Sequence, residues 1–575
     1  MLLDARTLDE KVVLDCDVCI VGAGAAGIAI ACELAGGPLS VLLIEAGGTS
    51  FRAAEQDPLQ GSVAPSSPHA PAHLYRRHGL GGATAVWGGR CVPLDPIDFE
   101  ARPYVPHSGW PVRWDEVAPF YPRAHHYLRS GACAYTVPEA LGADAPETIA
   151  GFRSDVIDTD RIERFSEPTD FAKAYLPRLQ QASNVRILVH AHCLRVETAE
   201  SGAVTALACA SDPQRRFAVR PRFTVIAAGG LEATRLLLAS DGSRRGGLGN
   251  ESGRLGRFYM CHIENTLGRL HLTPRARPAV VDFERTADGV YIRRKFCLNA
   301  DAQRRHGLMN ATFRLHFPFI SNPAHRNGIL SAVYLAKDCV LPEYRRKIAT
   351  IERSQRDRMV QDWRFWAAHV GNVARDTVPV GLFGADWVRR RILPRRKLPH
   401  VVVRNRNGVY PLDLNFEQVP NPDSRVGLGA DTDAFGVPRL HIDWRMTEQD
   451  IDGILRTMRV LRDAFARSGC ARLDIDEHTL EAQARDSTPI GGHHMGTARM
   501  AASPRDGVVD PNGEVFGTPG LFIAGSAVFP TCGHANPTLT IVALAVRLAD
   551  HLKMRARGET AVDVATPGQM AAVAC

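Results

Sequence analysis

Two kinds of side chain in the C-terminal part of the sequence are suited to moving a proton. The segment GGHHMGTARM, beginning at Gly491, places His493 beside His494, and Asn536 follows in GHANPTLT. A neutral imidazole can accept a proton near pH 7, and an Asn amide can hold a substrate oxygen without competing for that proton. Together they suit removal of a hydroxyl proton. Either histidine could instead be an ordinary polar residue of a glycine-rich turn, and Asn536 only a helix cap. The residues alone leave the choice between His493 and His494 open.

The elements around these residues can bring them to a bound ligand. Residues 521–524 form a short apolar run that is typical of a buried strand. Gly525 and Ser526 follow, so the backbone can lie against a ligand without obstruction by side chains. A helix is expected next, with Asn536 at its N-cap, Pro537 at its first position and TLTIVALAVRLADHL after them. The positive end of this helix favours a ligand that carries negative charge.

The stretch 17–48 has the pattern of a complete dinucleotide-binding unit. An apolar run leads into G-x-G-x-x-G at Gly22, Gly24 and Gly27, and a helix-compatible stretch follows. The first two glycines let the backbone turn and approach a pyrophosphate, and the third lets the helix pack close to the strand. A second apolar run ends in Glu45, whose carboxylate can accept hydrogen bonds from ribose hydroxyls.

Two further glycine-rich stretches are expected to reach the same ligand. Residues 78–90, HGLGGATAVWGGR, contain too many glycines for a regular helix or strand and free backbone N–H groups to wrap an anion. AAGG at 227–230 follows an apolar run and precedes a helical stretch, which repeats the strand, turn and helix pattern. The residues predicted to contact the ligand are Gly22, Gly24, Ala25, Ala26, Gly27, Glu45, Ala46, Gly81, Gly82, Thr84, Trp87, Gly88, Gly89, Ala228, Gly229, Gly525, Ser526, Asn536, Pro537 and Thr538.

Taken together, these motifs resemble those of the glucose-methanol-choline (GMC) oxidoreductases, which are FAD-dependent alcohol oxidases and dehydrogenases. The resemblance covers nearly the full length: GAGAAG with Glu45, LGGATAVWGG, AAGG with its helix, LGRFYMCHI, HHMGT and GSAVFPTCGHANPTLT. It implies that His493, which stands three residues before the Gly-Thr of its motif, is the catalytic base and that Asn536 is its partner. The GHANPTLT form resembles the branch that contains pyranose oxidases and fructose or gluconate dehydrogenases.

Three positions depart from the family pattern. Val86 stands where some relatives carry a histidine covalently linked to flavin, so noncovalent FAD is expected. Gly525 replaces an Asp that many relatives place in the strand before the last helix, and Cys261 replaces the Asp of a D-H-P-like motif. FAD remains the expected cofactor, and no metal site is predicted.

The predicted fold is α/β, with a Rossmann-like FAD-binding domain assembled from N- and C-terminal segments and an α+β substrate domain with an antiparallel sheet. A chain of 575 residues is too long for one compact core. We assign residues 1–120, 165–265 and 485–555 to the FAD-binding domain, 121–164 and 266–484 to the substrate domain, and 556–575 to a tail expected to be poorly ordered.

Two segments of the predicted substrate domain stand out. Residues 447–469 predict a helix that Thr447 caps and Gly469 ends, with one apolar face in the core. Residues 343–397 combine basic clusters with tryptophans. Such a mixture can lie on an anionic membrane surface, but a solvated and partly packed helical insertion is the preferred interpretation.

The composition is globular, 45% hydrophobic and 23% charged, and a net charge of +7 is modest, so nucleic acid is not an expected partner. The 13 cysteines show no framework spacing, which argues against a disulfide-stapled secreted protein. The nucleotide-binding turn explains the apolar run that begins at Val18, and no stretch reaches transmembrane length. A cytoplasmic location is expected, and the dominance of Arg over Lys is typical of a GC-rich bacterial gene.

The resemblance implies an enzyme that oxidises a CH–OH group of a sugar, polyol, glycoside or related alcohol to a carbonyl. His493 would take the hydroxyl proton while hydride passes to flavin N5, and oxygen or a quinone- or dye-type acceptor would reoxidise the flavin. A non-redox flavin lyase of hydroxynitrile-lyase type would use the same histidine. A noncatalytic flavin-binding protein fits poorly with His493 and Asn536 both present, and an NAD-dependent enzyme leaves the C-terminal strand and helix unexplained.

Overall fold

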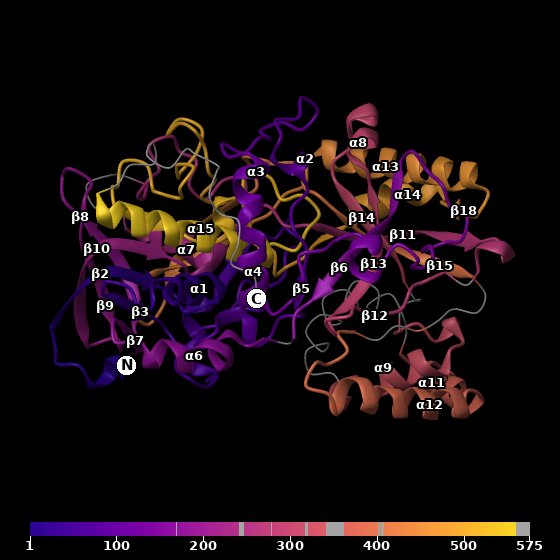
Figure 1. Ribbon diagram of the computed structural model, residues 1–575, viewed down its shortest axis with the longest axis horizontal. Coiled ribbons are helices and arrows are strands. Elements are labelled where there is room, and N and C mark those ends of the chain that lie inside the picture. The colour runs from indigo at the N-terminus through magenta and orange to yellow at the C-terminus, as the bar shows by residue number, and fades with distance from the viewer. Residues whose placement is uncertain are drawn as a thin grey trace.

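The computed structural model describes residues 1–167, 169–240, 246–277, 279–316, 320–340, 361–400, 403 and 408–558. Two large sheets form the body of the molecule, and a layer of helices lies along the lower edge of the second sheet (Figure 1). Hydrogen bonds join strands that are far apart in the sequence in both sheets, so neither domain comes from one continuous stretch of chain.

The first sheet consists of parallel strands on one side and an antiparallel hairpin on the other. Its order is β1 (Leu2–Asp4), β7 (Val185–Val189), β3 (Val41–Ile44), β2 (Val13–Val21), β10 (Arg216–Ile226), β9 (Val204–Ala210), β8 (His192–Thr198), and β20 (Leu521–Ile523) also pairs with β10. The pairs β2–β3, β2–β10 and β10–β20 are parallel. The carboxyl ends of these strands therefore meet at one edge, where open α/β sheets bind ligands.

Helices cover the first sheet and close its core. They are α1 (Ala25–Leu34), α6 (Phe171–Gln181), α7 (Gly229–Ala239) and α15 (Thr538–Arg557). The N-terminal helix α1 packs directly against the C-terminal helix α15, as Figure 1 shows in indigo and yellow. Both ends of the chain thus contribute to one core, which confirms the predicted Rossmann-like architecture.

The second sheet is antiparallel throughout. Its order is β18 (Ala471–Asp474), β11 (Ile263–Leu272), β15 (Val409–Phe416), β14 (Ala311–Leu315), β13 (Tyr291–Leu298), β6 (Ile157–Phe165) and β5 (Arg90–Cys91), with β12 (Glu284–Arg285) on β13 and β19 (Thr488–Pro489) on β11. The predicted helix is present as α13 (Glu448–Ser468), which packs its apolar face on this sheet through Met458 and Phe465. Thr447 accepts a hydrogen bond from Asp450 N, and Gly469 ends the helix in the left-handed conformation.

The remaining elements connect or flank the two sheets. A small third sheet consists of β16 (Arg425–Thr432), β17 (Pro438–Asp443) and β4 (Gly61–Val63). The other helices are α2 (Pro96–Phe99), α3 (Trp114–Val117), α4 (Tyr121–Leu128), α5 (Val137–Leu141), α8 (Ala300–His306), α9 (Gly328–Val340), α11 (Trp363–Arg375), α12 (Thr377–Trp387) and α14 (Glu477–Arg485). In the described part of the chain, no helix is long and apolar enough to cross a bilayer.

The structure differs from the sequence-based expectations in two places. Helix α15 begins at Thr538 with Pro537 at its N-cap, so the prediction that Asn536 caps it is wrong. The amide of Asn536 instead faces His493 and Arg90. Helix α4 packs against α15 and contributes Tyr121 to the core of the first sheet, although its segment was assigned to the substrate domain. The other domain boundaries stay a prediction.

Two segments singled out in the sequence lie outside the described residues. They are the basic cluster that follows Tyr344 and residues 559–575 of the predicted tail, whose first residues, 556 and 557, belong to α15 instead. Cys16 and Cys19 are free thiols, as are the other cysteines whose side chains the structure describes.

Candidate active site

A cavity opens at the carboxyl edge of the first sheet, and three helices begin at it. Ala25 and Ala26 of α1, Gly229 of α7 and Thr538 of α15 all line this cavity. In the described chain, none of the three helices has a side chain that caps its first N–H groups. Free N–H groups and the positive ends of three helix dipoles make this edge a site for an anionic ligand.

The dinucleotide turn has the geometry that its glycines require. Gly22 has φ +103°, in the left-handed region that glycine adopts without strain. A Cβ on Gly27 would lie 2.0 Å from the carbonyl oxygen of Gly22, so only glycine lets α1 approach the turn this closely. A Cβ on Gly24 would meet nothing within 4 Å, and Gly24 lines the cavity. The third glycine therefore serves packing, and the second faces the ligand space.

Glu45 holds the turn and the glycine-rich loop together. Its carboxylate accepts hydrogen bonds from the backbone N–H groups of Ala23 at 2.9 Å, Gly47 at 3.0 Å and Gly79 at 2.8 Å. The side chain is buried and lines the cavity. Contact between Glu45 and a ribose stays a prediction, and the structure adds a second role, since one carboxylate joins two segments of the binding site.

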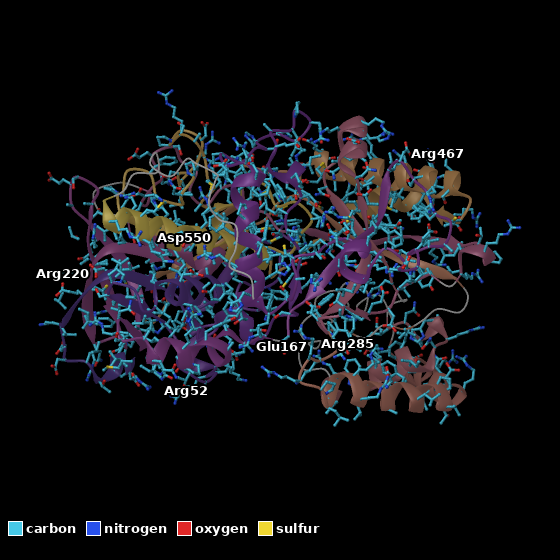
Figure 2. All side chains as sticks on the ribbon, viewed as in Figure 1. Arg52, Glu167, Arg220, Arg285, Arg467 and Asp550 are labelled. Carbon is cyan, nitrogen blue, oxygen red and sulfur yellow. The ribbon has the colours of Figure 1, made fainter. Side chains whose placement is uncertain are left out.

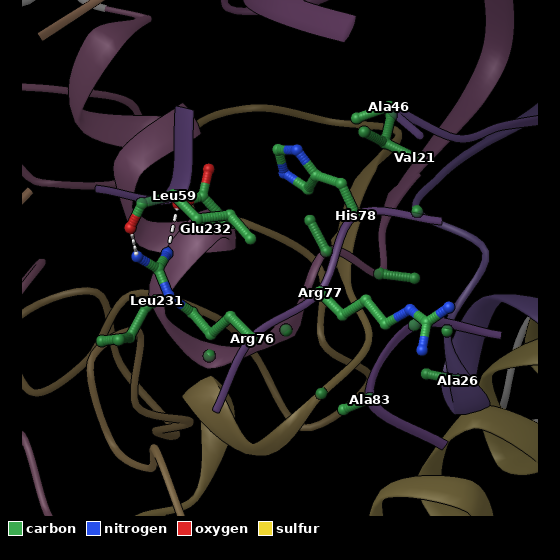
Figure 3. Close-up of a pocket in the computed structure, with 18 of the residues that line it drawn as sticks. Val21, Ala26, Ala46, Leu59, Arg76, Arg77, His78, Ala83, Leu231 and Glu232 are labelled. Atoms are coloured by element: carbon green, nitrogen blue, oxygen red, sulfur yellow. Dashed lines mark hydrogen bonds and ion pairs between the residues drawn. The ribbon is translucent and has the colours of Figure 1, made fainter. Parts of the chain in front are cut away.

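Three consecutive side chains that were not among the predicted contacts also line the cavity: Arg76, Arg77 and His78, the first residue of the glycine-rich stretch 78–90. Arg76 pairs with Glu232 and with the carbonyl of Leu59, as the dashed lines in Figure 3 show. The guanidinium of Arg77 extends toward Ala26 at the start of α1 (Figure 3), and its Nε is buried without a hydrogen-bond partner among the described residues. No motif marks Arg77, because it lies in a connection whose composition predicts only a loop.

At the other end of the cavity, His493 lies between two side chains from distant parts of the sequence. Its Nδ1 is 2.7 Å from Nδ1 of His262, and its Nε2 is 2.9 Å from Nδ2 of Asn536. An antiparallel bridge between Met260 and Met495 aligns the two histidine-bearing segments. The backbone N–H of Ile490 also donates to the carbonyl of His262 at 2.9 Å. Backbone pairing therefore sets the contact between His262 and His493.

This chain of contacts fixes the proton positions on both imidazoles. His262 Nε2 is 3.2 Å from the carbonyl oxygen of Cys532, which can only accept, so this nitrogen carries a hydrogen. Burial lowers the pKa of His262 to about 4, and its Nδ1 therefore has a free lone pair at neutral pH. His493 donates its Nδ1 hydrogen to that lone pair, which leaves His493 Nε2 as an acceptor for the amide of Asn536. The nitrogen that faces Asn536 is thus the basic one.

His494 points to a different neighbourhood from His493. Its ring lies 6.2 Å from that of His69 and 6.3 Å from that of Tyr259, and its Nε2 has no hydrogen-bond partner among the described residues. Burial lowers the pKa of His494 to about 3. Both histidines line the cavity, but His493 alone contacts Asn536 in the described structure.

A buried charged face of the second sheet extends from Asn536. Arg90 donates to the amide oxygen of Asn536 at 3.5 Å and lies 3.6 Å from the carboxylate of Glu163. Glu163 also pairs with Arg293 at 2.8 Å and Arg314 at 2.9 Å. Burial alone would raise the pKa of Glu163, but the three arginines hold it well below its usual value. Arg90, which contacts Asn536, is therefore held in place by a buried ion-pair network.

Most of the residues predicted to contact the ligand line the cavity. Those that do not are Gly27, Gly81, Gly88, Gly89 and Asn536. Gly81 donates its N–H to the carbonyl of Ala23, and Gly89 accepts from the N–H of Ser166, so these two glycines shape the loop. Among the residues that the structure describes, no group of His, Cys, Asp and Glu is arranged to hold a metal ion.

Comparison with known proteins identifies two family matches. The family described as "FAD dependent oxidoreductase" matches residues 17–335, which is more than half of the chain. The family described as "GMC oxidoreductase" matches residues 420–545, the part that contains His493 and Asn536. The first match covers the dinucleotide turn, and the second covers His493 and Asn536.

Several curated proteins are similar over most of their length. The 6'''-hydroxyparomomycin C oxidase of Streptomyces lividus is 24% identical over 93% of this chain and 92% of its own. The 2-methyl-1,2-propanediol dehydrogenase of Mycolicibacterium austroafricanum is 22% identical over 84% of this chain and 82% of its own.

Solved structures share the fold at low identity. The pyridoxine 4-oxidase of Mesorbium loti has a TM-score of 0.51 at 17% identity, covering 93% of this chain and 99% of its own. A fungal aryl-alcohol oxidase has a TM-score of 0.53 at 14% identity, covering 96% of this chain and 100% of its own. At such identities the likeness shows the fold.

The two glycines of the turn give a matched pair of substitutions. Gly27→Val should lower the free energy of unfolding by at least about 1–3 kcal/mol, because its side chain has no space against Gly22. Gly24→Val should change the stability of the flavin-free protein by less than about 0.5 kcal/mol but abolish flavin retention, because its side chain enters the cavity. Flavin absorbance per chain and thermal unfolding of the flavin-free variants measure both. Full flavin content in Gly24→Val would contradict this placement of the ligand.

Proposed function

This chain belongs to the GMC family of FAD-dependent oxidoreductases, and on that premise we propose that it oxidises a CH–OH group of a hydroxyl-rich small molecule, with His493 as the base. The observation that carries the proposal is the hydrogen-bond chain through His262, His493 and Asn536, which leaves His493 Nε2 ready to accept a proton. His493 lines the same cavity as the dinucleotide turn.

The residues of the cavity fit FAD. The uncapped N-terminus of α1 and the unpaired Nε of Arg77 suit a pyrophosphate, and Glu45 lies where the ribose of a dinucleotide is expected. The uncapped N-terminus of α15 lies beside His493 at the opposite end, where its positive dipole favours the negative charge of a reduced ring. When bound, FAD supplies the acceptor for the hydride that leaves the substrate carbon.

The chain's own residues handle the proton. The amide of Asn536, which donates to His493 Nε2 in this structure, is placed to hold the substrate oxygen when a hydroxyl group enters between them. His493 Nε2 then accepts the hydroxyl proton as the carbonyl forms. His262 stabilises the resulting imidazolium, since His493 keeps its Nδ1 hydrogen bond to His262 throughout. Arg90 fixes the Asn536 amide by donating to its oxygen.

The buried charged face favours a polar substrate over a hydrocarbon alcohol. Arg90 and the amide of Asn536 lie next to His493, and the ion pair with Glu163 holds Arg90 in place. Burying an apolar chain against these groups would cost free energy, whereas hydroxyls can exchange hydrogen bonds with them. The aminoglycoside and diol relatives bear names of hydroxyl-rich substrates, which agrees with this chemistry. We propose a sugar, polyol or glycoside as substrate and oxygen or a quinone-type molecule as the electron acceptor.

The cofactor is proposed to be held without a covalent bond. Val86 follows the turn Gly82–Ala85, is 40% exposed and carries no heteroatom that can bond to the flavin ring. Trichloroacetic acid precipitation should therefore release all of the yellow colour into the supernatant. A sample denatured in guanidinium and filtered through a size-exclusion membrane provides the control. Flavin that stays with the chain in both procedures would contradict noncovalent binding.

Substitution of the base tests the proposed function directly. His493→Ala should slow anaerobic flavin reduction by a sugar or polyol about 10²–10⁴-fold, the usual contribution of a positioned base. His494→Gln, a change at the neighbouring histidine, should stay within about tenfold of the wild-type rate. Stopped-flow absorbance of the flavin measures both. If His493→Ala reduces its flavin at the wild-type rate, the base is wrongly assigned. If no alcohol bleaches the wild-type flavin, the redox function fails and the non-redox lyase becomes the better reading.

The pH profile distinguishes His493 from the two buried histidines, His262 and His494. Since burial lowers the pKa of His262 to about 4 and that of His494 to about 3, both stay neutral above pH 5. The rate of flavin reduction should fall as the pH is lowered, because protonated His493 cannot accept a proton. His494→Gln should keep this acid limb, and His493→Asn should lose it.

His262→Leu provides the control for orientation in the same experiment. Without an acceptor for its Nδ1 hydrogen, the imidazolium of His493 is less stable, so the acid limb should move to lower pH and the rate should fall. A merely structural role for His262 predicts an unchanged limb position. An unchanged profile in His262→Leu would therefore contradict the hydrogen-bond chain.

A further inference from the structure

The described residues that expose large apolar side chains are concentrated in one layer of helices. Nine of the fourteen such residues lie between positions 335 and 393. The most exposed are Trp363, Val378, Leu382, Ile392 and Leu393, which are 61–75% exposed. We call residues 361–400, which contain these five side chains, the basic apolar layer. They belong to α11, to α12 and to the helical turn Val388–Ile392 with Leu393 directly after it. A monomeric globular surface scatters such side chains singly, so this concentration indicates an interaction surface.

The internal packing of the layer does not use these side chains. The inner faces of α9, α11 and α12 close a small core through Tyr334, Phe365 and Trp387. Trp387 is the one buried residue of α12 in the described structure, although the rest of this helix is largely apolar. A helix that is apolar on its outer face requires a nonaqueous environment on that side.

The layer also carries most of the net charge of the protein. Residues 361–400 contain eight Lys and Arg and three Asp, a formal excess of five in a chain whose total is +7. Arg389 is 77% exposed. Apolar side chains flanked by exposed basic ones are the composition of a surface that binds anionic lipids.

We propose that α11, α12 and the turn that follows them dock on an anionic lipid bilayer. Figure 1 shows α11 and α12 along one outer edge of the molecule, away from the first sheet. Arg395 reaches Glu167 at 3.6 Å, and Figure 2 places Glu167 at the side of this layer that faces the rest of the molecule. Helix α12 has 11 residues and is too short to span a bilayer. It therefore lies in the plane of the interface.

A second copy of the chain is a less suitable occupant of the same surface. A two-fold interface would place the patch against itself and bring two such positive excesses together. The cores of protein interfaces are depleted in charged residues, and like charges across them are costly. Anionic headgroups neutralise the arginines while the acyl region accepts Trp363 and Leu382. Charge complementarity thus favours lipid.

Vesicle co-sedimentation of the full-length holoenzyme tests the proposal. Wild-type protein should bind vesicles of phosphatidylglycerol and phosphatidylcholine at low salt, bind them more weakly at high salt, and bind pure phosphatidylcholine poorly. Arg364→Glu/Arg389→Glu should weaken binding to the anionic vesicles at least about tenfold. Trp363→Ser/Leu382→Ser/Leu393→Ser should weaken it at every salt concentration.

Matched substitutions elsewhere provide the controls. Arg467→Glu changes a 60% exposed arginine on α13, which Figure 2 shows at the opposite edge of the molecule, and should leave vesicle binding unchanged. Trp114→Ser changes an exposed tryptophan on α3 and should also leave vesicle binding unchanged. Flavin content and thermal unfolding verify that each variant is folded. The proposal is overturned if the wild-type protein does not bind anionic vesicles, or if the layer variants bind like the wild type. It is also overturned if those variants instead dissociate a dimer in light scattering.

Discussion

The hydrogen-bond chain from the Cys532 carbonyl through His262 and His493 to Asn536 is the interaction on which the proposed chemistry depends. Each link constrains the next, because a carbonyl can only accept and a buried neutral imidazole has one donor and one acceptor nitrogen. Four residues from three separate segments must be in place before the lone pair of His493 Nε2 faces the amide of Asn536. The domain architecture serves this requirement, since the two ends of the chain meet in the core of the first sheet.

The dinucleotide unit was predictable because its determinants are local. Gly22, Gly24 and Gly27 specify the turn and the close approach of α1 to it within a few residues. The apolar runs beside them are typical of buried strands. The helix at 447–469 was predictable for the same reason, through its capping residue, its stop and its periodicity. Local patterns of this kind survive into the tertiary structure because packing reinforces them.

The residues that sequence reasoning missed depend on long-range pairing. His262 contacts His493 through a bridge between segments more than two hundred residues apart, so no spacing in the sequence could reveal it. Arg77 enters the cavity from a connection without a motif. Asn536 was expected at the N-cap from the Asn-Pro pattern, but its amide is held by His493 and Arg90. A residue that gains a tertiary partner can leave the position that its local sequence favours. Sequence propensities do not report such partners.

The position of Glu45 has a consequence for the order in which the binding site is built. Its carboxylate accepts hydrogen bonds from N–H groups of both the dinucleotide turn and the loop at Gly79. The protein itself therefore holds this loop in a fixed position relative to the turn. A loop that is already ordered loses little conformational entropy when a ligand arrives. The free energy of the contacts with the cofactor then contributes to affinity, because little of it is needed to order the loop. One buried acid thus makes the cavity a preorganised receptor, ready before the ligand is present.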